Sequence, residues 1–263
     1  MTYQKQKLDM NDINKERICL IYQPLGIGDV FFCQGIGQHF VNKGYKVIWP
    51  LASHVMYLKD YINSPGVEFV DVKSEFYKKD IYQKQYDDPW NLYPMIIEED
   101  FIFLPLSNAQ FRVKDSSLMY SKYELLELDF NIWRDNFNFI RNIERENNLY
   151  YNILGLKDDE QYVFLNKKFG TPPHYHEAPF NVDTDNKIVE MQFIPGDNLF
   201  DWLKVIENAS MIVTVDTSYQ YLMEKMDNFK ATDFYCYPRN GKEEWISIIN
   251  KLFTKIDWNY FTT

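Results

Sequence analysis

The sequence predicts an α/β protein in which parallel strands alternate with helices. Residues 18–72 read as strand, helix, strand, helix, strand, and the same alternation resumes after residue 160. Several strands are continuous apolar runs, such as ICLIYQ (18–23) and MIVTV (211–215), which is typical of strands buried on both faces of a parallel sheet. Because parallel neighbours need a crossover connection, these observations favour right-handed βαβ units and Rossmann-like sheets.

The N-terminal elements follow from apolar spacing and from breakers. Phe32, Ile36 and Phe40 recur every four residues, which predicts a helix that starts at Asp29 and ends before Gly44. Further expected elements are strands at 46–50, 67–72 and 101–106, a Ser-capped helix at 53–62, and one long amphipathic helix at 131–154 that stops at Gly155.

The C-terminal elements are predicted in the same way. An acidic run at 158–160 reads as a solvated linker, so we expect a first domain over 1–156 and a smaller second domain over 157–242. The second part is expected to hold strands at 161–166, 187–194, 211–215 and 231–237, a loop at 169–186, and helices after Asp197 or Asn198, after Asp216 and over 243–256.

Composition narrows the possible partners. The 263 residues are 46% hydrophobic and can fill a core, while a net charge of −10 opposes attraction to nucleic acid or anionic lipid. A small or neutral partner is favoured. No apolar run is long enough for a membrane span, the N-terminus lacks a signal-peptide pattern, and the three cysteines read as buried, reduced thiols, so we expect a cytoplasmic protein.

The turn after the first strand is the first candidate site. Gly26 and Gly28 match two glycines of a dinucleotide fingerprint, but Phe31 stands where the third would be. Asp29 at the helix entrance would compete with a phosphate for the free amides. Two interpretations stay open: Asp29 caps its helix, or it is an exposed general base at the carboxyl end of a central strand.

The second candidate site follows the strand at 211–215. Asp216, Thr217 and Ser218 open a helix, and Thr217 with Gln220 matches a capping box, so the amides there either are simply capped or hold a diphosphate. Lys167 and Lys168 follow another strand and could neutralise a leaving phosphate, or they are a solvated surface pair. No metal site is predicted, because the loop histidines His174 and His176 have no second cluster to complete a ligand shell.

These residues resemble a known family. Leu25 to Val30 is similar to the first loop of GT-B glycosyltransferases of the heptosyltransferase-like (GT9-like) group, and residues 205–218 resemble the family's segment of helix, strand and Asp-Thr that faces the donor. The chain departs from the family pattern after the Asp-Thr pair, with Ser218 in place of Gly and a Tyr in place of His.

The resemblance implies two facing Rossmann-like domains, with the acceptor on the first, the nucleotide sugar mostly on the second, and the segment 243–263 returning to the first. It implies an inverting, metal-independent glycosyltransferase without a cofactor, which moves a sugar from a nucleotide-diphosphate sugar to a glycan or other hydroxyl acceptor. Asp29 would be the base, and Lys167 or Lys168 with the amides at Thr217 and Ser218 would stabilise the diphosphate. A catalytically inactive sugar- or nucleotide-binding protein and a Rossmann oxidoreductase remain as alternatives.

Overall fold

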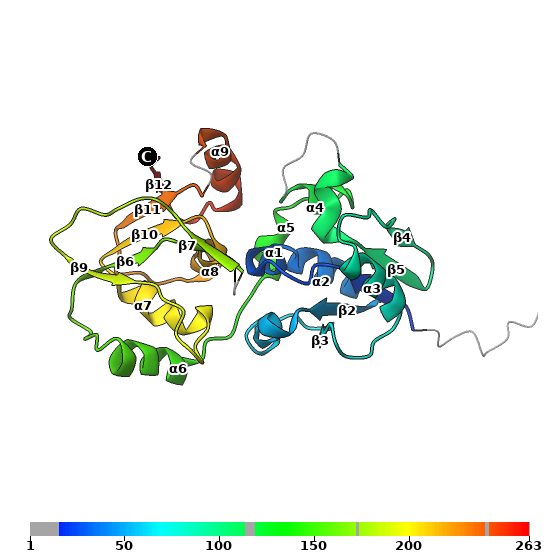
Figure 1. Ribbon diagram of the computed structural model, residues 1–263, viewed down its shortest axis with the longest axis horizontal. Helices are drawn as coiled ribbons and strands as arrows, with labels where there is room; N and C mark the ends of the chain where they lie inside the picture. The colour runs from blue at the N-terminus through cyan, green and yellow to red at the C-terminus, as the bar shows by residue number, and fades with distance from the viewer. Residues whose placement is uncertain (1–15, 114–118, 172–173, 240–241, 263) are drawn as a thin grey trace, which may run out of the picture.

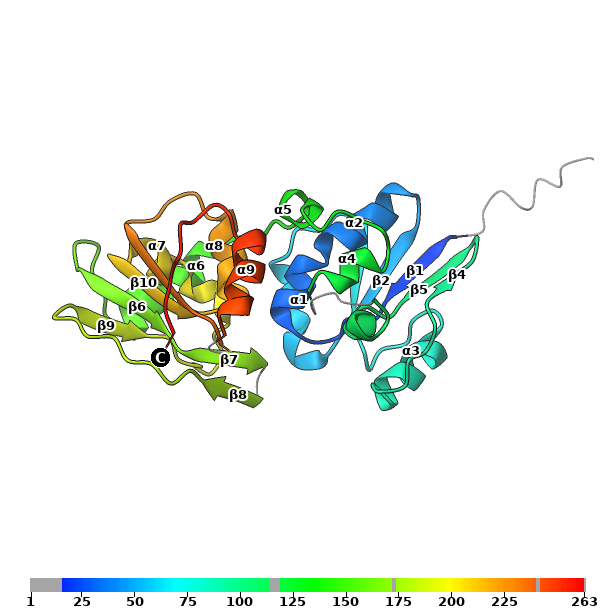
Figure 2. The same cartoon turned by 90° about the horizontal axis from the view of Figure 1, so that it is seen from above.

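The computed structural model describes residues 16–113, 119–171, 174–239 and 242–262. Two five-stranded sheets lie next to each other along the long axis of the molecule, each flanked by helices (Figures 1 and 2). No helix within the described ranges is both long enough and apolar enough to cross a membrane.

The first sheet has the strand order β3-β2-β1-β5-β4, and its neighbours pair in parallel except for β4, which is antiparallel to β5. Its strands are β1 (Ile18–Ile21), β2 (Lys46–Leu51), β3 (Val67–Asp71), β4 (Ile96–Ile97) and β5 (Phe101–Leu104). The helical elements around it are α1 (Ile27–Phe32), α2 (Gln34–Asn42), η2 (Ser53–Asp60), α3 (Lys79–Asp87), η3 (Leu106–Phe111), α4 (Ser121–Glu124) and α5 (Ile132–Asn136).

The second sheet is parallel throughout, with the order β12-β11-β10-β6-β9. Its strands are β6 (Tyr162–Asn166), β9 (Lys187–Glu190), β10 (Met211–Val215), β11 (Asp233–Tyr237) and β12 (Asn259–Tyr260). The helical elements of this part are α6 (Ile143–Asn147), η4 (Asn148–Ile153), η5 (Leu199–Trp202), α7 (Leu203–Asn208), α8 (Ser218–Lys225) and α9 (Glu243–Leu252).

The predicted fold class is confirmed. The apolar runs at 18–23, 46–50 and 211–215 correspond to strands β1, β2 and β10, although β1 ends at Ile21, before the predicted end. The sheets are flanked by helices, an arrangement compatible with a two-domain GT-B fold. We call the chain up to α5 the N-terminal half and the chain from α6 onward the C-terminal half. The domain boundary expected between residues 156 and 157 stays a prediction; just before it, α6 and η4 pack against η5 and α7.

Three predicted elements differ in detail. The helix expected from Asp29 is two helices, because the chain turns at Cys33 between α1 and α2. Residues 53–60 form a 3₁₀ helix whose N-cap is Ala52, since the Ser53 hydroxyl donates to Asp71 instead of capping. The loop expected at 169–186 contains an antiparallel hairpin of β7 (Lys168–Thr171) and β8 (His174–Glu177).

The long helix predicted over 131–154 is wrong. Helix α5 ends at Asn136, Phe137 is extended, and Phe139 forms an antiparallel bridge with Ile62 before α6 begins. This segment connects the two sheets, and an extended chain spans more distance per residue than a helix. The apolar spacing therefore predicted helix correctly for α5 and for the helical segment that begins with α6, but not for the residues between them.

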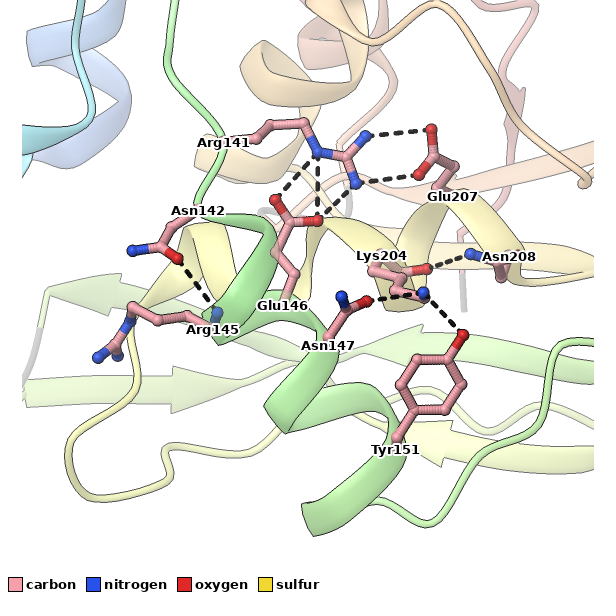
Figure 3. Close-up of polar contacts among 9 residues, drawn as sticks. All are labelled: Arg141, Asn142, Arg145, Glu146, Asn147, Tyr151, Lys204, Glu207 and Asn208. Carbon is pink, nitrogen blue, oxygen red and sulfur yellow. Dashed lines mark hydrogen bonds and ion pairs between the residues drawn. The ribbon is translucent and has the colours of Figure 1, made fainter.

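A cluster of ion pairs fixes the end of this connection (Figure 3). Arg141 lies just before α6, and its Nε is 3.0 Å from Glu146 Oε1, while its Nη2 is 2.9 Å from Glu207 Oε2 of α7. The side chain of Glu146 is 1% exposed, so Arg141 supplies the countercharge of a buried carboxylate. The side chain of Asn142 caps α6 by accepting from Arg145 N.

Aromatic side chains pack between the two halves. Phe31 of α1 lies with its ring centroid 5.9 Å from Phe200 of η5 and 6.4 Å from Tyr221 of α8. Tyr61 stacks on Phe200 at 4.4 Å, and Asn198 donates to the Tyr61 hydroxyl. These side chains, apart from the half-buried Asn198, are buried, so apolar burial holds the halves together.

Helix α9 also joins the halves. The Tyr120 hydroxyl donates to the carbonyl of Ile248, and Arg134 of α5 donates to the carbonyls of Lys251 and Leu252. The C-terminal helix is therefore bonded to residues of the N-terminal half.

Candidate active site

A cavity of about 870 Å³ lies between the carboxyl ends of the two sheets. In the first sheet β1 lies between β2 and β5, and in the second sheet β6 lies between β9 and β10. The strand order therefore changes direction at β1 and at β6, and open α/β sheets bind ligands at such switch points. The lining residues that matter below are Gly26, Gly28, Asp29, Lys168, Tyr175, Phe193, Asp216, Thr217, Ser218, Gln220 and Arg239.

The turn after β1 presents Asp29 to this cavity. Gly26 is the N-cap of α1 with φ 77°, and no side chain caps the helix, so the capping interpretation of Asp29 is wrong. Asp29 is the third residue of α1, and its side chain is 25% exposed. A Cβ at Gly26 would lie 2.3 Å from Asp29 Oδ2. A residue with a side chain at position 26 would therefore clash with the Asp29 carboxylate.

Lys122 of α4 is the charge partner of Asp29. Its Nζ is 3.2 Å from Asp29 Oδ1 and 3.4 Å from the carbonyl oxygen of Leu106, and its side chain is 1% exposed. A lysine buried to this degree needs a countercharge, which Asp29 provides. Sequence reasoning missed Lys122, because the surrounding YSKYE has no pattern that marks a buried ammonium group.

The entrance of α8 forms the opposite wall. Thr217 is its N-cap and accepts from Tyr219 N, which confirms the cap, and Asn166 at the end of β6 donates to Thr217 Oγ1. The reciprocal half of the predicted capping box is wrong, since the Gln220 amide instead donates to Cys236 Sγ. The start of α8 lines the cavity, and the start of a helix favours a bound anion.

Asp216 is held by an arginine that the sequence did not single out. Arg239 donates to Asp216 through its backbone N and through Nε, at 2.9 Å for Nε. Burial raises the pKa of Asp216 above its usual range, and the Arg239 guanidinium opposes that shift. Asp216 is therefore bonded within the wall, while the Arg239 side chain is 46% exposed and lines the cavity.

The two lysines after β6 have different surroundings. Lys168 lines the cavity, with Nζ 3.3 Å from Glu190 Oε1 and 3.2 Å from the carbonyl of Met191. Lys167 is not among the described lining residues, and its Nζ lies 3.2 Å from Glu177 Oε1. The structure therefore brings Lys168, but not Lys167, to the cavity.

The histidines of the HYH motif belong to strand β8 and not to a loop. His176 is exposed and packs beside Phe169 of β7, with ring centroids 5.5 Å apart. Across the ranges that the structure describes, no group of three or more His, Cys, Asp or Glu side chains is placed to hold a metal ion.

The two candidate corners meet across one cavity. A Cβ at Gly28 would lie 3.8 Å from the Cα of Ser218 and 3.2 Å from the ring of Tyr221, so α1 and the start of α8 are in close approach. A glycine at residue 28 permits this approach. The cavity is therefore lined by Asp29 on its N-terminal wall and by the start of α8, Lys168 and Arg239 on its C-terminal wall.

Comparison with known proteins gives similarity in structure only. No family model matches the sequence, and no curated protein matches it. The chain is similar to the crystal structure of a family 9 glycosyl transferase from Veillonella parvula DSM 2008, with 11% identity, a TM-score of 0.46, and coverage of 93% of this chain and 91% of that chain.

It is also similar to TibC, an iron-containing dodecameric glycosyltransferase from enterotoxigenic E. coli H10407, with 11% identity and a TM-score of 0.38. A second TibC structure, described as a heptosyltransferase in complex with ADP-D-beta-D-heptose, matches with the same values. The match covers 79% of this chain and 55% of TibC. Both proteins are described as glycosyltransferases.

Proposed function

We propose that this protein is a glycosyltransferase that moves a sugar from a nucleotide-diphosphate sugar to an acceptor hydroxyl, with inversion and without a metal ion. The observation on which this proposal depends is that Asp29, the start of α8, Lys168 and Arg239 all line the same cavity. A base on one wall and an anion site on the other suit a displacement between an acceptor and a diphosphate leaving group.

In the proposed reaction the acceptor oxygen attacks the anomeric carbon, and the bond from that carbon to the diphosphate oxygen breaks. The electron pair leaves with the diphosphate, and the acceptor proton passes to Asp29. Lys122 acts as a positioning residue: its contact at 3.2 Å fixes Asp29 Oδ1, and a carboxylate has further lone pairs for the acceptor hydroxyl.

The departing diphosphate gains negative charge on the opposite wall. The amides at Thr217 and Ser218, the α8 dipole and the side chains of Lys168 and Arg239 would stabilise that charge in place of a metal ion. Lys167, which lies with Glu177, is not assigned a role.

The donor would be a hexose or heptose carried by a nucleoside diphosphate, and the ADP-heptose in the TibC complex makes ADP-linked sugars the first donors to test. The acceptor would be a glycan or another small hydroxyl compound. The three buried free thiols suit a reducing compartment, so we place the reaction in the cytoplasm.

Calorimetry with ADP, UDP and GDP, followed by turnover assays with the matching nucleotide sugars in EDTA, tests the proposal. We expect the wild type to bind at least one nucleotide and to turn over its sugar in EDTA. Asp29→Asn should keep the nucleotide affinity and lose turnover by about 10²- to 10⁴-fold, because it removes the proton acceptor. It also removes the countercharge of Lys122, so urea unfolding of the variant confirms that the protein assayed is folded.

Asp80→Asn is the matched control, since Asp80 also lies in the first turn of a helix but is exposed and outside the cavity lining. It should behave as the wild type does. Absence of nucleotide binding by the wild type would refute the proposal. Nucleotide binding without any turnover would instead identify an inactive binding protein, and full turnover by Asp29→Asn would remove Asp29 as the base.

A further inference from the structure

Two aromatic rings line the cavity without being part of a core. Tyr175 of β8 is 48% exposed, and Phe193, which follows β9, is 46% exposed. Their ring centroids are 4.7 Å apart with an interplanar angle of 50°. Large aromatic side chains that line a cavity and are about half exposed have apolar area available for a ligand.

The backbone around Tyr175 leaves its ring accessible. Tyr175 pairs with Gly170 across the β7–β8 hairpin, and a glycine has no side chain to cover its neighbour. Figures 1 and 2 show this hairpin reaching from the C-terminal half toward α1. The hairpin thus carries Tyr175 along the edge of the cavity.

The same elements carry Lys168, the proposed cation for the diphosphate. Lys168 is the first residue of β7, two residues before Gly170, and its Nζ donates to the carbonyl of Met191, two residues before Phe193. Lys168 therefore connects the β7–β8 hairpin, which contains Tyr175, to the segment after β9, which contains Phe193. A diphosphate bound at Lys168 would have its nucleoside within reach of both rings.

We propose that Tyr175 and Phe193 form a stacking platform for the nucleobase of the donor. This inference rests on the proposed function, since it concerns the donor of that reaction. A nucleobase is planar and presents a π face, whereas the acceptor belongs next to Asp29 in the other half. Every nucleobase has such a face, so the platform contributes affinity and does not by itself select one base.

The test is calorimetry of the full-length double variant Tyr175→Leu with Phe193→Leu, using ADP, UDP, GDP and inorganic pyrophosphate. Leucine keeps apolar bulk but removes the π face. The nucleotides that the wild type binds should bind about tenfold to a hundredfold more weakly to the variant, while pyrophosphate affinity should be unchanged. Tyr77→Leu is the matched control, because Tyr77 is 47% exposed and is not among the described cavity-lining residues.

Each other outcome overturns the platform in a distinguishable way. If wild type and double variant bind nucleotides equally, the diphosphate site stands and the base lies elsewhere. If the variant loses pyrophosphate as much as nucleotides, the rings only support the hairpin. If the wild type binds neither nucleotide nor pyrophosphate, the proposed function fails and the platform fails with it.

Discussion

At the scale of single residues, the position of Asp29 depends on two contacts, one with Gly26 and one with Lys122. Gly26 lacks the Cβ that would lie 2.3 Å from Asp29 Oδ2, and it adopts a φ of 77° that other residues rarely adopt. Lys122 supplies the charge that balances the carboxylate. Both conditions hold the carboxylate in the cavity wall.

Gly26→Ala should displace Asp29 and lower the free energy of unfolding. The left-handed backbone alone costs roughly 1 to 2 kcal/mol, and the clash with Asp29 should add about 1 kcal/mol or more. Gly155→Ala is the control, since Gly155 has φ 64° with no atom within 4 Å of an added Cβ. Urea unfolding should show the larger loss for Gly26→Ala; equal losses would mean that Asp29 moves without cost.

The ion pair of Asp29 and Lys122 should respond asymmetrically to truncation. Asp29→Ala leaves an ammonium group that is 1% exposed without its countercharge, which should cost about 3 kcal/mol. Lys122→Met leaves a carboxylate that is 25% exposed and can be hydrated, so its cost should be about 1 kcal/mol or less. Urea unfolding of both variants measures this order, and a larger loss for Lys122→Met would contradict it.

At the scale of elements, the connection between the sheets shows why apolar spacing alone did not place helices. Residues 131–154 have helical spacing throughout, yet the chain is helical only in α5, α6 and η4. The extended part pairs at Phe139 with Ile62, and Arg141 ends it with ion pairs to α6 and α7. Two of these partners, Ile62 and Glu207, are distant in sequence, and such contacts override local preference.

Arg141→Ala should destabilise the protein by roughly 3 to 5 kcal/mol, because it leaves Glu146 buried without a countercharge. Glu146→Gln in the same chain should restore part of this loss by removing the buried charge. Glu207→Gln should cost about 1 kcal/mol or less, since Glu207 is 25% exposed. Chemical denaturation of the three variants checks this order, and a double variant no more stable than Arg141→Ala would contradict the assignment.

At the scale of the whole molecule, burial determines how stability depends on alkaline pH. Cys19, Cys33 and Cys236 are buried free thiols, and desolvation raises the pKa of each above its usual range. Burial also raises the pKa of Tyr22 to about 12. The folded state therefore keeps protons that the unfolded chain loses.

Stability should fall as the pH rises above about 8.5, where thiols of the unfolded chain ionise but those of the folded protein do not. The expected loss is roughly 1 to 2 kcal/mol per buried thiol for each pH unit. Urea midpoints at pH 8 and pH 10 measure it, and Cys33→Ala should show a shallower decrease. Identical midpoints at the two pH values in the wild type would contradict the prediction.

The sequence by itself determined the α/β class, most strands, the glycine turn before Asp29 and the cap at Thr217. These features depend on local patterns: continuous apolar runs, helix starts and breakers within a few residues. The same patterns predicted that both corners lie at the carboxyl ends of strands, where open sheets bind ligands.

Only the tertiary structure decided which side chains meet there. Lys122 reaches Asp29 from 93 residues away in the chain, Arg239 reaches Asp216 from the end of another strand, and Tyr175 meets Phe193 through a hairpin that the sequence did not predict. It also separated Lys168 from Lys167 and divided the long helix. Such contacts depend on burial and on partners far apart in the sequence, and neither is recorded in local spacing.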